Sequence, residues 1–170
     1  MLVNTALDCQ NNTSNHLRYF ENTQSAPIEI TEVNFGIFNS GTTEVVTVNI
    51  YGIMPGSAFV YANMNLLATT DFSVPAGMNQ SIFTAMIEAT IPVGMDYVLE
   101  LRANNTTNFV IGYNNQGETE STYISGNPPV PCVSLEPTDI DGLGNFGALA
   151  VVLYSNAQVG PSIEQTTGLP

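Results

Sequence analysis

The chain of 170 residues contains no lysine, and its two basic side chains are Arg18 and Arg102. The absence of lysine excludes Schiff-base chemistry, a pyridoxal phosphate anchor and a P-loop, because each depends on a lysine amine. Fifteen acidic residues outweigh the two arginines and give a formal net charge of −13 at pH 7. We therefore expect no binding to nucleic acid or to an anionic membrane surface, since both require a basic patch.

Long hydrophobic runs are also absent. Hydrophobic residues make up 44% of the chain, which is enough for the core of one domain. Apolar stretches such as residues 148–154 are nevertheless far shorter than the ~18 residues of a membrane-spanning helix, so we expect no membrane insertion. Residues 1–8 lack the basic and apolar regions of a signal peptide. If the protein is exported, we expect that a signal has been removed or that the sequence is part of a longer chain.

Residues suited to catalysis are scarce. His16 is the only histidine and thus the only imidazole available to a serine triad. It lies at the start of an expected strand, so we expect a surface or capping role for it. The 15 carboxylates mean that composition alone does not exclude a glycan-active enzyme, but the absence of tryptophan argues against an aromatic-lined cleft. The sequence therefore predicts that the protein is not an enzyme.

The chain has two cysteines, Cys9 and Cys132. In an acidic, lysine-free chain this pair favours a disulfide. The bond would close a long loop and stabilise the fold by roughly 4–5 kcal/mol in the chain-entropy model. The alternative is two buried free thiols. A zinc site is disfavoured, because only His16 could join the cysteines and two further ligands would be missing.

Alternation of apolar and polar residues recurs along the chain, whereas helical periodicity is hard to find. In residues 46–51, for example, β-branched side chains occupy every second position, which is typical of a strand with one buried face. We expect eight or nine strands that form an all-β, antiparallel, jelly-roll-like β-sandwich. The expected strands are 16–20, 28–30 continuing into 33–38, 46–51, 66–74, 81–91, 97–102, 107–113 and 146–154.

Turn-forming residues separate these strands, most clearly where Pro or Asn precedes Gly at 39–41, 54–56, 75–77 and 92–94. The stretches SVPAGMN (73–79) and TIPVGMD (90–96) are similar to each other, and we expect two strand-turn corners there. Residues 1–154 are predicted to form one domain. Residues 155–170 are predicted to be a C-terminal linker or tail, because few of them can bury apolar surface.

Several of these segments follow one another in an order that is similar to that of a known family. The series runs from Cys9 through HLRYF (16–20), ITEVNFGI (30–37), VTVNIY (46–51), IPVGMDYVLEL (91–101) and FVIGYNNQGET (109–119) to TYI (122–124), Cys132 and EPTDI (136–140). Over about residues 9–154 this series resembles the accessory β-sandwich domain appended to many secreted bacterial peptidases, polysaccharide-active enzymes and cell-surface proteins. The resemblance implies an exported, jelly-roll-like module without catalytic residues, and it supports the pairing of Cys9 with Cys132. The sequence departs from the family at 55–65, where we expect an extended loop or an extra hairpin.

Calcium is the cofactor that the sequence favours. Asp139 and Asp141 are followed by glycines and Asn145, so oxygen ligands alternate in a segment whose backbone can fold around an ion. Calcium takes six to eight oxygens, and the others could come from Asp8, Asn11, Asn12 or Glu136, which a bridge between the cysteines would bring close. The alternative is a polar turn before the last strand.

Ligand binding would have to use tyrosine, because tryptophan is absent. The most attractive segment is 112–118, in which Tyr113, Asn114, Asn115 and Glu118 combine an aromatic ring with amides and a carboxylate. The alternative is an ordinary Asn/Gly turn. Further candidate tyrosines, which could equally be core or sheet-surface residues, are Tyr51, Tyr61, Tyr97 and Tyr123.

Together these features favour a non-catalytic extracellular accessory or adhesion module that binds a surface, a polysaccharide or a neighbouring domain. A self-assembling surface or filament subunit is the alternative, because edge strands without lysine can pair with copies of the chain. A glycan-active enzyme is a second, weaker alternative. We expect a location outside the cell or at its surface.

Overall fold

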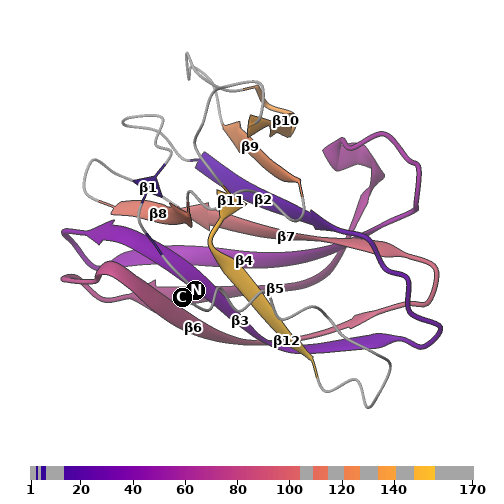
Figure 1. The fold of residues 1–170 in the computed structure, drawn as a ribbon, viewed down its shortest axis with the longest axis horizontal. Coiled ribbons are helices and arrows are strands. Elements are labelled where there is room, and N and C mark those ends of the chain that lie inside the picture. Colours follow the sequence, from indigo (N-terminus) through magenta and orange to yellow (C-terminus); the bar gives the residue numbers. More distant parts are fainter. Residues whose placement is uncertain are drawn as a thin grey trace.

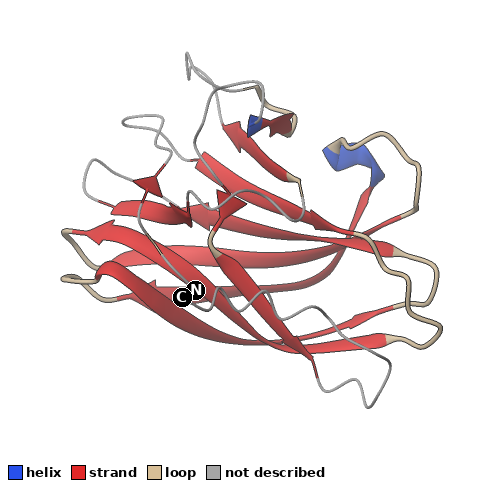
Figure 2. Cartoon of the chain, viewed as in Figure 1, coloured by secondary structure: helices blue, strands red, loops and turns tan. Residues whose placement is uncertain are grey.

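The computed structural model describes residues 3, 5–6, 14–103, 109–114, 121–126, 134–140 and 148–155. Strands account for most of this part of the chain, as Figure 2 shows. The connection between β4 (Glu44–Ile53) and β5 (Met64–Val74) contains one turn of 3-10 helix, η1 (Tyr61–Asn63). Nine of the strands in the described part have five or more residues, which agrees with the eight or nine that were expected.

The strands form two antiparallel sheets (Figure 1). The first sheet contains, in spatial order, β10 (Thr138–Asp139), β9 (Thr122–Gly126), β2 (Ser14–Phe20), β7 (Asp96–Ala103), β4 (Glu44–Ile53) and β5 (Met64–Val74). The second sheet contains β1 (Thr5–Ala6), β8 (Phe109–Asn114), β3 (Ile28–Ser40) and β12 (Val151–Ser155), with β6 (Asn79–Ile91) paired to β3 and β11 (Ala148–Leu149) paired to β8. The expected all-β antiparallel sandwich is confirmed.

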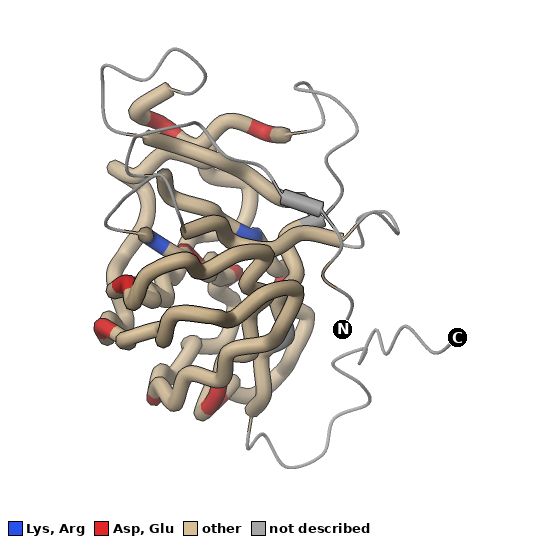
Figure 3. The backbone as a smooth tube through the Cα atoms, turned by 90° about the vertical axis from the view of Figure 1, so that its left-hand side faces the viewer, with Lys and Arg blue, Asp and Glu red and all other residues tan. Residues whose placement is uncertain are grey.

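Acidic and basic residues are distributed differently over the structure. Figure 3 shows acidic positions in many parts of the described chain, whereas basic positions occur at two places. These are Arg18 on β2 and Arg102 on β7, which are neighbouring strands of the first sheet. Of the two, Arg18 is buried and Arg102 is exposed.

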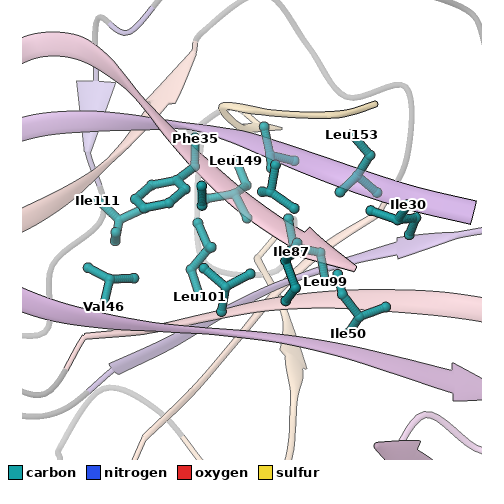
Figure 4. Packing of buried hydrophobic residues seen from close by; sticks show 14 of the residues in the cluster. Ile30, Phe35, Val46, Ile50, Ile87, Leu99, Leu101, Ile111, Leu149 and Leu153 are labelled. Carbon is teal, nitrogen blue, oxygen red and sulfur yellow. The ribbon is translucent and has the colours of Figure 1, made fainter. Parts of the chain in front are cut away.

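The core lies between the sheets because alternate residues of each strand face the opposite sheet. Figure 4 shows this packing for labelled residues of both sheets. On β7, for example, Leu99 and Leu101 belong to the core and are fully buried. The residues that alternate with them, such as Val98 and Glu100, therefore lie on the opposite side of the first sheet, which we call the outer face. The labelled core residues are Ile30, Phe35, Val46, Ile50, Ile87, Leu99, Leu101, Ile111, Leu149 and Leu153.

The two similar sequence stretches form the expected corners. The first carries the chain from β5 in the first sheet to β6 in the second, and the other carries it from β6 back to β7. Each corner turns at a glycine with positive φ, 88° at Gly77 and 74° at Gly94, which glycine adopts without strain. The chain therefore passes between the sheets at both points, as a jelly-roll-like path requires.

The last predicted strand is divided. Its first part, β11, pairs with β8, and its second part, β12, pairs with β3. At the division the Ala150 carbonyl accepts a hydrogen bond from the Gly36 amide at 2.8 Å, and the Ala150 amide donates to the Gly112 carbonyl at 3.1 Å. β12 extends to Ser155, one residue beyond the predicted domain boundary, and residues 156–170 lie outside the described residues.

Candidate functional site

The outer face of the first sheet carries polar side chains on neighbouring strands. Glu100 of β7 pairs with Leu17 of β2 on one side and with Asn49 of β4 on the other. Tyr123 of β9 stands opposite Leu17. Alternation along each strand places all four side chains on the side away from the main core. The register alone therefore assembles a row of residues from four strands.

The connection between β4 and β5, residues 54–63, covers part of this outer face. It begins with a turn in which the Ser57 amide donates to the Met54 carbonyl at 3.1 Å and ends in η1. Its Phe59 and Tyr61 side chains pack with Tyr123 against a second apolar cluster formed by Leu17, Ile53 and Val98. The sequence predicted an extended loop or extra hairpin here, and the structure has a turn followed by a 3-10 helix.

Glu100 lies at the centre of a hydrogen-bond network beneath this connection, with only 2% of its surface exposed. Its Oε2 accepts from Asn49 Nδ2 at 2.6 Å and from the Tyr51 hydroxyl at 2.9 Å. Its Oε1 accepts from the Tyr61 hydroxyl at 2.6 Å. Three donors thus satisfy the buried carboxylate, as the burial of an ionised group requires.

Tyr61 joins this network to the neighbouring strands. Its hydroxyl lies 2.6 Å from Ser125 Oγ on β9 and accepts a hydrogen bond from Asn15 Nδ2 on β2 at 3.2 Å. The backbone amide of Tyr61 donates to Glu136 Oε2 at 2.9 Å. These bonds fix the position of η1 against β2, β7 and β9.

Three aromatic rings lie beside the network, and the middle one, Phe59, contacts the other two. The Phe59 and Tyr123 ring centroids are 4.1 Å apart with an interplanar angle of 37°, and the Tyr19 and Phe59 centroids are 5.7 Å apart at 84°. All three side chains are partly exposed. The Tyr19 hydroxyl donates to Asp96 Oδ2, and Asp96 Oδ1 accepts from the Asn22 amide at 2.8 Å. We call Tyr19, Phe59 and Tyr123 the aromatic patch.

The tyrosine hydroxyls of the outer face are held in their protonated form. Desolvation raises the pKa of Tyr51 and of Tyr61, and the negative charge of Glu100 raises both further. The pKa of Tyr19 is likewise raised, first by desolvation and then by its hydrogen bond to Asp96. The hydroxyls therefore remain hydrogen-bond donors to the buried carboxylates across the physiological pH range.

His16 is placed differently from the expectation. It is buried on the inner side of β2, where its Nδ1 lies 2.7 Å from the Tyr113 hydroxyl and its Nε2 lies 3.0 Å from Ser14 Oγ. Burial lowers the pKa of His16 to about 4, so the imidazole is neutral at pH 7. The expected surface or capping role is wrong, because β2 turns this side chain into the sandwich.

The predicted ligand segment at 112–118 is corrected in part. Tyr113 is fully buried and its ring packs edge-on against His16 with centroids 5.7 Å apart, so it cannot stack on a ligand at the surface. Asn114 is half-buried at the end of β8. Asn115 and Glu118 lie outside the described residues.

The predicted calcium site and disulfide fall mostly outside the described residues. Asp139 is exposed on β10, whereas Asp141 and Asn145 are not described, and neither are Cys9 and Cys132. Within the described part of the chain, no group of three or more His, Cys, Asp or Glu side chains is placed to hold a metal. Calcium binding and the disulfide stay predictions.

Sequence reasoning named three tyrosines of this face as candidates, Tyr51, Tyr61 and Tyr123, and the outer face brings them together. Tyr97, named with them, lies in the main core. Of the aromatic patch, sequence reasoning named Tyr123 and missed Tyr19 and Phe59. Within the network it missed Glu100 and Asn49. The available signal was a polar residue within a strongly alternating strand, but such residues are ordinarily solvent-exposed.

Comparison with known protein families, curated proteins and solved structures finds no match to this chain. Among the described residues, no helix has the length and hydrophobicity needed to cross a membrane.

Proposed function

We propose that this chain is a non-catalytic extracellular accessory or adhesion module that binds a surface, a polysaccharide or a neighbouring domain. The observation that supports this proposal is the aromatic patch on the outer face. Its rings are partly exposed, and hydrogen-bonded neighbours hold them in position. Aromatic side chains that combine apolar area with fixed geometry are well suited to recognition.

The non-catalytic part of the proposal rests on how the buried ionisable groups are used. Glu100 and Asp96 accept hydrogen bonds from several donors of the chain itself. His16 lies inside the sandwich, away from this face. A general acid or base must reach its substrate within hydrogen-bonding distance, and the bonds of these carboxylates already serve the fold.

Binding is tested by co-sedimentation of the purified chain with insoluble polysaccharides and with whole bacterial cell envelopes. We expect the chain to enter the pellet and the variant Phe59→Ala to remain in solution, because the substitution removes the central ring of the patch. Tyr154→Ala is the matched control, since Tyr154 is an exposed aromatic residue on β12 of the second sheet. A wild-type chain that stays in solution with every material would contradict the proposal.

A second candidate function is self-assembly through strand edges. In the described part of the chain, β5 pairs only with β4 and β6 pairs only with β3, so each has an open edge. Neither strand contains lysine or proline, and each has one carboxylate. Exposed apolar side chains lie on both, with Leu66 50% and Met86 63% exposed. Long edges without these protective residues favour pairing with another chain.

Assembly is tested by light scattering at increasing protein concentration. If copies pair through β5 and β6, the apparent mass should rise with concentration, and the double variant Leu66→Lys/Met86→Lys should stay monomeric, because lysine on an edge strand opposes pairing. Val93→Lys, at an exposed turn position, controls for the added charge. A strict monomer at all concentrations would rule out this second function.

A further inference from the structure

The geometry points to a neutral polysaccharide, one built of uncharged pyranose rings, as the ligand of the aromatic patch. This inference rests on the function proposed above and narrows its ligand class. Pyranose rings present flat faces of C–H groups, and such faces bury apolar area against aromatic rings. The aromatic area that the described outer face supplies for such a contact is that of three partly exposed side chains, Tyr19, Phe59 and Tyr123.

The arrangement of the rings does not form a cage for a cation. A site that surrounds a cation holds its aromatic faces around the ion, each within about 6 Å of it. In the patch the Phe59 ring instead packs against Tyr123 at 4.1 Å and against Tyr19 at 5.7 Å. Because the Phe59 ring contacts both of the other rings, no space is left between them for an ammonium group.

The carboxylates beside the patch are not available to pair with a cationic ligand. Glu100 is 2% exposed and Asp96 is 5% exposed. Both are occupied by hydrogen bonds from the chain, Glu100 from Tyr61 among others and Asp96 from Tyr19. Asp96 thereby orients Tyr19 of the patch, which lowers the entropic cost of binding because this side chain is already ordered before the ligand arrives.

The same carboxylates disfavour an anionic ligand. Asp96, Glu100 and Glu136 lie on or beside the outer face, where they outnumber its one arginine, Arg102, which follows Glu100 by two residues on β7. The formal net charge of −13 adds a repulsive field over the whole surface. Uronate or sulfate groups would therefore lose binding energy on this face, whereas an uncharged sugar ring would not.

The test uses affinity gel electrophoresis and titration calorimetry at physiological salt. The probes are soluble neutral glucans and mannans, the anionic polymer polygalacturonate and the cationic chitosan oligosaccharide. We expect binding to a neutral polymer that depends on Tyr123, whereas the attraction of chitosan to the net charge of −13 should not depend on Tyr123. Tyr123→Leu should weaken it about tenfold or more, because leucine fills the space but lacks the flat face, and Tyr123→Phe should change it by less than about threefold. Circular dichroism and urea unfolding verify that each variant is folded, and Tyr154→Ala serves again as the matched control.

The outcomes separate this inference from the function on which it rests. Binding of polygalacturonate or chitosan with the same dependence on Tyr123 would overturn the neutral ligand class and leave the binding function standing. Binding of a neutral polymer that is unaffected by Tyr123→Leu would overturn the assignment of the patch. A chain that binds no polysaccharide and no cell envelope would overturn both.

Discussion

Replacing Glu100 with leucine is expected to lower the free energy of unfolding by about 3 kcal/mol. The carboxylate accepts hydrogen bonds from Asn49, Tyr51 and Tyr61, and its removal leaves these donors without their acceptor. Asn49 is itself buried, with 7% of its surface exposed, so water cannot readily replace the lost bond. The measurement is urea unfolding followed by circular dichroism.

Two further variants separate this network from other effects of the substitution. Glu100→Gln retains one carbonyl oxygen and the same shape, so we expect a smaller loss than for leucine. Glu88→Leu removes a carboxylate from an exposed position on β6 and thereby controls for the relief of net negative charge. The network would have no stabilising role if Glu100→Leu were as stable as Glu88→Leu.

Lowering the pH from 6.5 to about 4 is expected to remove about 3 kcal/mol of stability through His16 alone. Burial lowers the pKa of His16 from its ordinary value of 6.5 to about 4 in the folded chain. Between these two values the unfolded chain binds a proton that the folded chain does not, so protonation favours unfolding. The contribution of the neutral imidazole is therefore complete above pH 6.5 and is lost as the pH falls to about 4.

The variant His16→Gln isolates this contribution. Glutamine can hydrogen-bond the Tyr113 hydroxyl but does not titrate, whereas the carboxylates titrate in both proteins. The difference in unfolding free energy between wild type and variant should therefore change by about 3 kcal/mol between pH 7.5 and pH 4, in the direction that disfavours wild type at low pH. A difference independent of pH would show that His16 is not buried as a neutral group.

The strands and corners were predictable because their signals are local. In residues 46–51, every second side chain must reach the same side of the sheet, and the β-branched positions Val46, Val48 and Ile50 all prove fully buried. The corners at 75–77 and 92–94 were predictable for a similar reason, since a proline and a glycine at fixed spacing determine the local backbone. Neither inference depends on where the rest of the chain lies.

The outer face was not predictable because its burial comes from distant segments. Alternation assigns Glu100 to the side of β7 away from Leu99, and that side is ordinarily solvent-exposed. It is buried here because residues 54–63 fold over it and place the Tyr61 hydroxyl on the carboxylate. Tyr113 illustrates the converse error: its neighbours predicted a surface loop, but β8 turns its ring toward His16 in the interior.

By itself the sequence determined the charge of the chain, the absence of lysine and of the chemistry that needs it, the antiparallel strands and the corners between the sheets. These follow from composition and from periodicity over a few residues. Only the tertiary structure decided which side of each strand would meet another segment, which tyrosines would gather on the outer face and that His16 would be buried. The reason is that such contacts join residues far apart in the chain, as Asn15 and Ser125 or His16 and Tyr113 are, and their pairing depends on the order of strands in the sheets.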